Sequence, residues 1–135
     1  MPLLSIESLE VAIGETPVLH PITLALQVGK TLAWGGESGS GKSMTALAIL
    51  GLLPNQARSR GKIALNGEDL LTQSEKAMCA IRGRDIGMIF QEPMSALNPM
   101  LGIGEQVAEV LRLHRKVSRT ESLRRARELL ERVGL

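Results

Sequence analysis

The stretch GESGSGKS, residues 36–43, matches the phosphate-binding loop pattern G-x-x-x-x-G-K-[ST] at every fixed position. The apolar run KTLAW, residues 30–34, predicts a buried strand before it, and residues 42–52 predict a helix closed by Pro54. Glycines let the backbone curl so that successive amide N–H groups point at an anion, and the helix start adds its positive dipole end. The sequence therefore predicts a polyphosphate site.

Two side chains of this loop have defined chemistry in the pattern. Lys42 would reach the β- and γ-phosphates of a nucleotide, and the Ser43 hydroxyl would ligate Mg²⁺. The alternative is a glycine-rich turn that caps a helix and binds nothing. The full match, with a predicted strand before it and a predicted helix after it, favours phosphate binding.

The composition is that of one soluble domain: 135 residues, 44% hydrophobic and 22% charged, with a formal net charge of +2. The single cysteine, Cys79, excludes an internal disulfide framework and is expected to be an ordinary thiol. The small net charge and the scarcity of aromatic residues argue against nucleic acid as a partner. Without a secretory signal or an apolar run of about 20 residues, we expect membrane contact only through a partner.

Alternating apolar and polar residues predict two strands at 3–13 and 18–28, joined by a turn at 14–17. Residues 58–70 predict a loop, a short strand and a turn at Asn66-Gly67. The first third of the chain therefore predicts an antiparallel arrangement beside the phosphate-binding loop.

Capping-box spacing predicts two helix starts. Thr72 and Glu75 predict a helix that runs to about Ile81, and Ser118 and Glu121 predict another. Between them, residues 85–90 predict a short strand and residues 91–100 a loop. An apolar stripe at helical spacing is expected to be buried in the last third, at Ile103, Val107, Val110, Leu111, His114, Leu123, Ala126, Leu129, Leu130 and Val133.

The segments LAWGGESGSGKS, residues 32–43, and IGMIFQEPMSALNP, residues 86–99, resemble the ATP-binding subunit of ABC transporters. The resemblance is to the branch that energises import of oligopeptides, dipeptides and nickel, including microcin-type peptide transporters. It implies an α/β fold: a P-loop NTPase core of the ABC type, with antiparallel β strands at the N-terminus and the start of an α-helical subdomain. Residues 1–101 would be core and residues 102–135 the beginning of the helical subdomain, which makes an incomplete domain.

The resemblance also implies which residues bind ATP and Mg²⁺, the expected cofactors. Gln91 would open the Q-loop and approach Mg²⁺ and the attacking water, so that Ser43 and Gln91 are the expected residues on the metal side. An aromatic residue usually stacks on adenine in the family, and here Ile13 holds that place, so we expect weaker stacking. The triphosphate would be bound by Gly36, Glu37, Ser38, Gly39, Ser40, Gly41, Lys42, Ser43 and Met44.

The printed sequence lacks three further motifs of the family: LSGGQ, a Walker B strand ending in Asp-Glu, and the switch histidine. Catalysis by the chain alone is therefore left open, and we expect Mg-ATP binding by a truncated or split form without hydrolysis. Glu92 is expected to be a solvated loop residue and no substitute base. The implied partners are transmembrane permease subunits and a second ATP-binding domain in a head-to-tail dimer, at the cytoplasmic face of the inner membrane.

Two other functions remain as alternatives. A non-catalytic nucleotide-binding regulatory module would bind ATP without turnover. A different P-loop enzyme, such as a small kinase, would need an acidic residue at the end of an apolar strand, and it leaves residues 91–99 unexplained. Trp34 is expected to pack in the core beneath the loop, and the arginines between Arg112 and Arg132 to form a solvated helix face with interspersed glutamates.

Overall fold

The computed structural model describes residues 2–34, 41–89 and 97–135. The chain divides into two compact units, Met1–Met78 and Cys79–Leu135, and each is described by itself. The two units are defined by the contacts that their residues make with one another. The boundary between core and helical subdomain predicted at residue 101 stays a prediction. Among the described residues, none of the helices has both the length and the apolar character that a membrane span requires.

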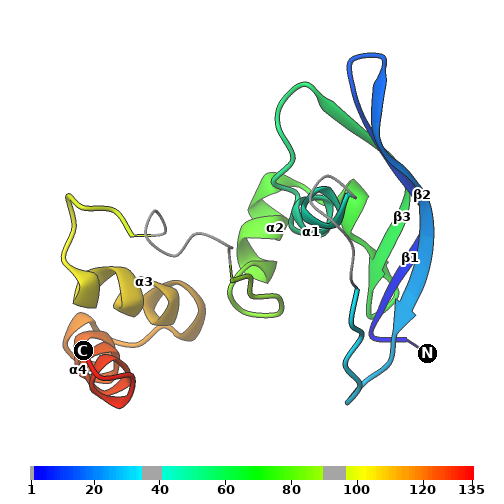
Figure 1. The fold of residues 1–135 in the computed structure, drawn as a ribbon. Coiled ribbons are helices and arrows are strands. Elements are labelled where there is room, and N and C mark those ends of the chain that lie inside the picture. Colours follow the sequence, from blue (N-terminus) through cyan, green and yellow to red (C-terminus); the bar gives the residue numbers. More distant parts are fainter. Residues whose placement is uncertain (1, 35–40, 90–96) are drawn as a thin grey trace. The chain divides into compact units, whose positions relative to one another are not determined.

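The first unit is built on a four-stranded antiparallel sheet with the order β2-β1-β3-β4 (Figure 1). A two-residue turn at Gly14 and Glu15 joins the first two strands, which confirms the predicted hairpin. The strands are β1 (Leu4–Ile13), β2 (Thr16–Leu26), β3 (Ala57–Leu65) and β4 (Glu68–Asp69).

The third strand is longer than predicted. We expected a loop at the start of residues 58–70, but β3 begins at Ala57 because it pairs with β1 as far as Ile13. The predicted turn after it is confirmed, since Asn66 and Gly67 have φ values of 52° and 87°. Positive φ at both central residues is the signature of the tight hairpin turn that Asn-Gly favours.

A β-bulge bends the sheet at Ser8. The register of β1 against β3 shifts between Glu7 and Glu10. Ser8 has a left-handed φ of 47°, and its N–H donates to Thr23 Oγ1 at 3.0 Å. On the facing strand Gly61 has a φ of 106°, and a Cβ there would lie 2.5 Å from the carbonyl oxygen of Ser8. Both the dihedral angle and the close backbone approach require glycine at position 61.

The core of this unit lies between one face of the sheet and α1 (Lys42–Leu50). Figure 1 shows α1 beside the sheet, and the predicted helix is confirmed up to Gly51, whose φ of 69° ends it in a left-handed cap. The side chains buried here are Ile6, Leu9, Val11, Leu19, Thr45, Ala48, Leu50, Ile63, Leu70 and Met78.

The helix predicted from Thr72 begins two residues later. In α2 (Glu75–Ile81) the cap is Ser74, whose Oγ accepts from the N–H of Ala77 at 3.1 Å. Thr72 instead ends the short 3₁₀ helix η1 (Leu70–Thr72), where its hydroxyl donates to the carbonyl oxygen of Asp69 at 3.1 Å. The capping-box prediction was wrong because Thr72 belongs to the preceding 3₁₀ turn, and Ser74 is the residue that caps the helix.

Two predicted strands do not form. Residues 30–34 have neither helix nor strand, and Leu32 and Trp34 are 49% and 40% exposed, so the prediction of a core tryptophan was also wrong. Within residues 85–89 only Ile86 makes a bridge, a parallel one to Arg82; Phe90 lies outside the described residues. A strand requires a neighbour for its backbone N–H and C=O groups, and in the described part of the chain no strand pairs with either segment.

The second unit contains two helices that pack as a hairpin, α3 (Ile103–Arg115) and α4 (Arg119–Arg132). The predicted cap of α4 is confirmed, because Ser118 Oγ accepts from the N–H of Glu121 at 3.1 Å. Small residues are fully buried, Ala108 on α3 with Ser122 and Ala126 on α4, so the backbones approach closely.

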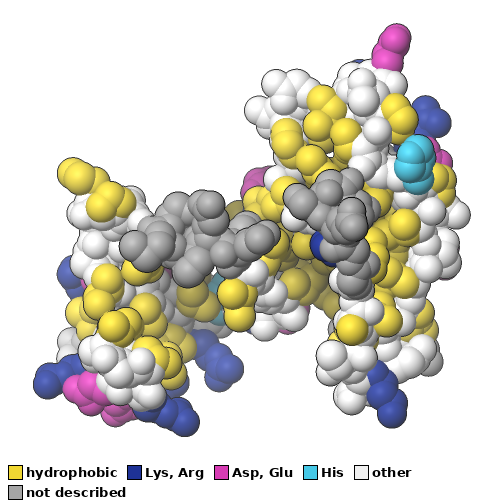
Figure 2. All heavy atoms as spheres, in the orientation of Figure 1, with side chains coloured by type: hydrophobic (Ala, Val, Ile, Leu, Met, Phe, Trp, Pro, Cys, Tyr) yellow, Lys and Arg dark blue, Asp and Glu magenta, His cyan; other side chains and the backbone are white. Residues whose placement is uncertain are grey.

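The predicted apolar stripe of this hairpin is only partly buried. Ala126 is inside, but Ile103, Val110, Leu129 and Val133 are all at least 45% exposed. Figure 2 shows hydrophobic side chains on the visible surface of this unit. Two packed helices cover one narrow strip of each other, so the wider stripe of about 100° stays partly uncovered.

The arginines of α4 form the solvated face that the sequence predicts. Arg124 bonds to Glu121 and Glu128, and Arg125 also bonds to Glu121, all at helical i,i+3 or i,i+4 spacing. Hydrogen bonds from Arg124 and then Arg125 lower the pKa of Glu121 to about 2. These exposed pairs orient Glu121 near the start of α4, where a negative charge also complements the helix dipole.

Replacing Gly61 by alanine tests the bulge. We expect Gly61→Ala to lower the free energy of unfolding by about 2 kcal/mol or more, because it adds backbone strain and a clash with Ser8. Gly14→Ala is the matched control: Gly14 has a φ of 60° with nothing within 4 Å of an added Cβ. It should cost only the dihedral strain, about 1 kcal/mol. If urea denaturation showed that Gly61→Ala and Gly14→Ala lose the same free energy of unfolding, the close approach at Gly61 would be contradicted.

The pKa of Glu121 predicts a pH-dependent contribution to stability. A carboxyl whose folded pKa is lowered stabilises the fold above its unfolded pKa and loses that contribution as pH falls through the folded value. We therefore expect the stability difference between the protein and Glu121→Gln to shrink from about pH 4.5 to about pH 2. Glu109→Gln, on the exposed surface of α3, is the matched control. A difference that stays constant over this range in urea denaturation would contradict the prediction.

Candidate functional site

The described part of the phosphate-binding loop is its junction with α1. Gly36, Glu37, Ser38, Gly39 and Ser40 lie outside the described residues. Gly41, Lys42, Ser43 and Met44 are within them and form the N-cap and first turn of α1. The structure therefore places four of the nine predicted phosphate-binding residues at one helix start.

Gly41 turns the chain into the helix. It has φ 91° and ψ 3°, a left-handed conformation that L side chains rarely adopt. Its carbonyl oxygen accepts two hydrogen bonds from Thr45, one from the backbone N–H and one from Oγ1, both at 3.0 Å. Thr45 is buried, so this pair of bonds is shielded from water. The orientation of the peptide between Gly41 and Lys42 is thereby fixed.

Gly41 is also packed against the sheet. A Cβ on Gly41 would lie 2.5 Å from Leu19 Cδ1, so the Leu19 side chain fills the space that any other residue would need. Leu19 belongs to β2, where it pairs with Val11 of β1. The dihedral angles of Gly41 therefore require glycine, and a larger residue at this position would also force the Leu19 side chain to shift.

The helix start has the charge pattern of an anion site. No acidic residue lies in the first turn of α1. Helix geometry leaves the first-turn amides without intrahelical acceptors, and the dipole places partial positive charge there. Ser43 is exposed, as a hydroxyl that binds a cation must be, and Lys42 is half-buried. These groups fit a phosphate with its bound Mg²⁺.

The other predicted site residues have a less defined place. Gln91, and Glu92 beside it, lie outside the described residues, so the role of Gln91 near Mg²⁺ and water stays a prediction. Ile13 is half-buried at the end of β1, where it pairs with Thr16 and Ala57. Its place against adenine also stays a prediction. Among the described residues, no group of three or more His, Cys, Asp and Glu side chains is arranged to hold a metal ion.

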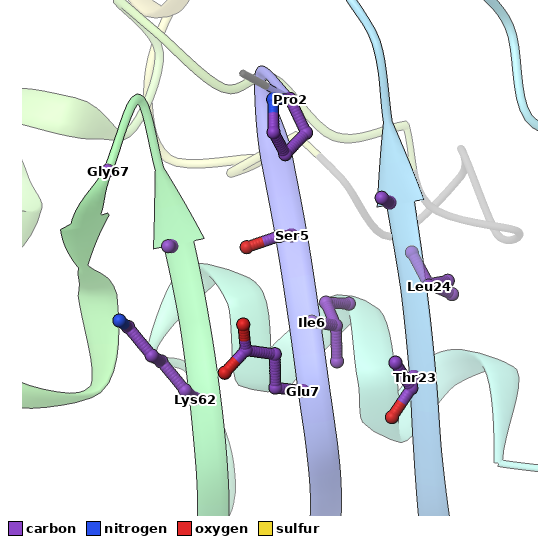
Figure 3. A pocket seen from close by; sticks show the side chains of 10 residues that line it. Pro2, Ser5, Ile6, Glu7, Thr23, Leu24, Lys62 and Gly67 are labelled. Carbon is purple, nitrogen blue, oxygen red and sulfur yellow. The ribbon is translucent and has the colours of Figure 1, made fainter.

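A separate hollow of about 550 Å³ lies over the sheet of the first unit (Figure 3). Small side chains line it, among them Ser5, Ala25 and Ala64, and the charged pair Glu7 and Lys62 faces each other across β1 and β3. Residues 41–44 do not line it. Its lining, which also includes the apolar Ile6 and Leu24, contains none of the described residues of the phosphate-binding pattern, so the helix start remains the candidate site.

Two residues of the site were not predicted from the sequence. Thr45 follows Gly41 by four positions, the spacing at which a threonine hydroxyl bonds back to a carbonyl within a helix, and this is a signal that sequence analysis can use. No sequence pattern indicates the contact of Leu19 with Gly41, because the two residues are distant in the chain.

Comparison with known proteins gives a family match over most of the chain. The model of the family described as "ABC transporter" matches residues 19–135. The oligopeptide transport ATP-binding protein OppD of Bacillus subtilis is 48% identical over 124 residues, which are 90% of this chain and 35% of that protein. The peptidoglycan transport ATP-binding protein YejF of Agrobacterium fabrum is 48% identical over 140 residues, 99% of this chain and 26% of that protein.

A third relative is a putative peptide import ATP-binding protein of Brucella abortus, 45% identical over 145 residues, which are 99% of this chain and 43% of that protein. The chain thus spans between about a quarter and about two fifths of the length of these relatives.

Proposed function

The chain belongs to the ABC transporter family, and from this membership we propose that it is the ATP-binding part of an importer for peptides or related small solutes. In this proposal the chain binds Mg-ATP through Gly36–Met44. Binding would be coupled to rearrangement of a membrane permease. The names of the relatives, oligopeptide transport and peptide import ATP-binding proteins, support the choice of solute class.

One observation carries the proposal: the G-K-S end of the loop forms a left-handed glycine followed at once by the start of α1. This arrangement aims main-chain amides and the helix dipole at one point, with Lys42 and Ser43 beside it. ATP and Mg²⁺ fit these groups because the phosphates are polyanionic and the hydroxyl is a hard oxygen ligand. When bound, ATP supplies the triphosphate whose binding and hydrolysis drive family members. The residues of this chain hold and orient that group.

The proposed partners follow from the family rather than from a contact in this chain. We propose transmembrane permease subunits, reached through residues 91–99 and the helices α3 and α4, and a second ATP-binding domain. The protein would then be peripheral at the cytoplasmic face of the inner membrane. The exposed apolar side chains of the α3–α4 hairpin support a covered surface there.

The alternative proposal is a non-catalytic nucleotide-binding regulatory module. Hydrolysis in the family uses a carboxylate and a partner's signature motif beside the γ-phosphate. Such a module would bind ATP without turning it over. Co-purification with permease subunits separates a transporter component from a free-standing module.

Removing the loop lysine tests nucleotide binding. We expect Lys42→Ala to weaken the binding of a fluorescent ATP analogue by about tenfold or more, because a charge-assisted contact with phosphate is lost. Lys62→Ala, an exposed lysine on β3, removes the same charge at a different place and should bind as the unmodified protein does.

Two results would contradict the proposal. Unchanged affinity in Lys42→Ala would remove the phosphate site from the loop. Steady release of phosphate by the purified chain, lost in Lys42→Ala, would show an enzyme that is complete without a partner and would overturn the binding-only form of the proposal.

The adenine side of the site has its own test. If Ile13 lies against the base, Ile13→Tyr should strengthen ATP binding about fivefold, since an aromatic ring adds about 1 kcal/mol of stacking. Binding of inorganic tripolyphosphate, which has no base, should not change and serves as the control ligand. An equal gain for both ligands would mean that the substitution acts on the fold rather than on the base.

A further inference from the structure

The contact between Leu19 and Gly41 joins the antiparallel sheet to the phosphate-binding loop. Leu19 is 4% exposed. Its Cδ1 lies 2.5 Å from the position that a Cβ on Gly41 would take. Leu19 has no polar atom in its side chain, so it has no hydrogen bond to offer a phosphate group. Any effect on a bound anion must therefore pass through the position of Gly41.

On its other side Gly41 is held by the helix. The N–H and Oγ1 of Thr45 both donate to the carbonyl oxygen of Gly41 at 3.0 Å. These bonds fix the direction of one peptide, while Leu19 restricts the position of the Cα itself. The amides of Lys42 and Ser43 follow directly, so their direction depends on both restraints.

The sheet is deformed where it presents Leu19. Between the pairs Leu9↔Ile22 and Val11↔Leu19, β2 has one more residue than β1, and the same is true between Val11↔Leu19 and Ala12↔Pro17. Leu19 therefore lies between two register shifts. Bulges of this kind bend a strand and redirect a side chain, and they are frequent beside functional sites.

We propose that Leu19 is a positioning residue for triphosphate binding: the bulged part of β2 presents its side chain as the surface on which Gly41 rests. This inference depends on the proposed phosphate site. Its physical basis is preorganisation. Amide donors bind an anion best when they are held in the binding direction before the anion arrives, and donors that must be ordered on binding lose affinity. Truncating Leu19 leaves the donors in place but loosens their direction.

The first experiment compares two leucine truncations of the same sheet. We expect Leu19→Ala to weaken the affinity of the folded protein for Mg-ATP by about tenfold, since displacement of binding groups by about 1 Å has effects of this size or larger. Leu9→Ala is the matched control, because Leu9 is also buried, on the neighbouring strand, and none of the three atoms nearest to an added Cβ at position 41 belongs to it. The affinity of Leu9→Ala for Mg-ATP should stay within about twofold of that of the unmodified protein, even if the variant is less stable.

Urea denaturation of each variant separates stability from affinity, and titrations use only conditions in which circular dichroism shows a folded protein. If Leu19→Ala does not fold, Leu19→Val shortens the same side chain with a smaller loss of packing and serves in its place. Leu19→Met, which keeps the length of the side chain, should restore most of the affinity. Equal affinities for the Leu19 and Leu9 truncations would overturn the inference.

The second experiment is a double-mutant cycle. Gly41→Ala should weaken nucleotide binding strongly, because its Cβ meets Leu19 and its dihedral angles are strained. Adding Leu19→Ala removes the steric part, so the double variant should bind more tightly than Gly41→Ala alone. A double variant that binds no better would show that Leu19 does not take up the space beside Gly41. That result would also overturn the inference.

These results are distinguishable from failure of the proposed function. If the unmodified chain binds Mg-ATP and Lys42→Ala weakens it, while Leu19→Ala matches Leu9→Ala, only the role of Leu19 is wrong. If the unmodified chain and Lys42→Ala bind equally, the phosphate site itself is wrong and both proposals are overturned.

Discussion

The described site depends on one backbone constraint, the left-handed conformation of Gly41. Its φ of 91° directs the chain from the loop into α1, and the two hydrogen bonds from Thr45 hold the peptide that follows. Only glycine meets this requirement without strain and without a clash against Leu19. The glycine therefore does two things at once: it allows the turn, and it lets the sheet approach the helix start closely enough to support it.

The parts of the structure that sequence analysis predicted are those set by short-range interactions. Ser118 caps α4 through a bond to a residue three positions on, and Asn66-Gly67 forms the tight turn that its dihedral preferences favour. The start of α1 is another such case, because the spacing of the pattern alone indicates a helix start with Lys42 and Ser43 in the first turn. The family match agrees with the ABC-type fold that the same residues implied.

The strand predictions that failed have a common physical cause, which is that a strand is defined by its neighbours. Residues 30–34 and 85–89 have strand-like apolar character but lack a paired strand among the described residues, whereas residues 58–60 look polar and still join the sheet because β1 extends beside them. The predicted burial of Trp34 depended on a strand at residues 30–34. Because that strand does not form, the Trp34 side chain is exposed. The contact of Leu19 with Gly41 was missed for a related reason, since it depends on tertiary packing.

In the described residues, the two segments that flank the loop differ in how they are held. The segment before the loop, residues 30–34, is exposed and pairs with no strand in the described part of the chain. The segment after it is anchored, because α1 is buried against the sheet at Thr45 and Ala48 and Gly41 rests on Leu19. Among the described residues, the restraint on the direction of the first amides comes from the anchored side. A small change in β2, far from the glycines in sequence, can therefore act on the phosphate site as directly as a change within the loop.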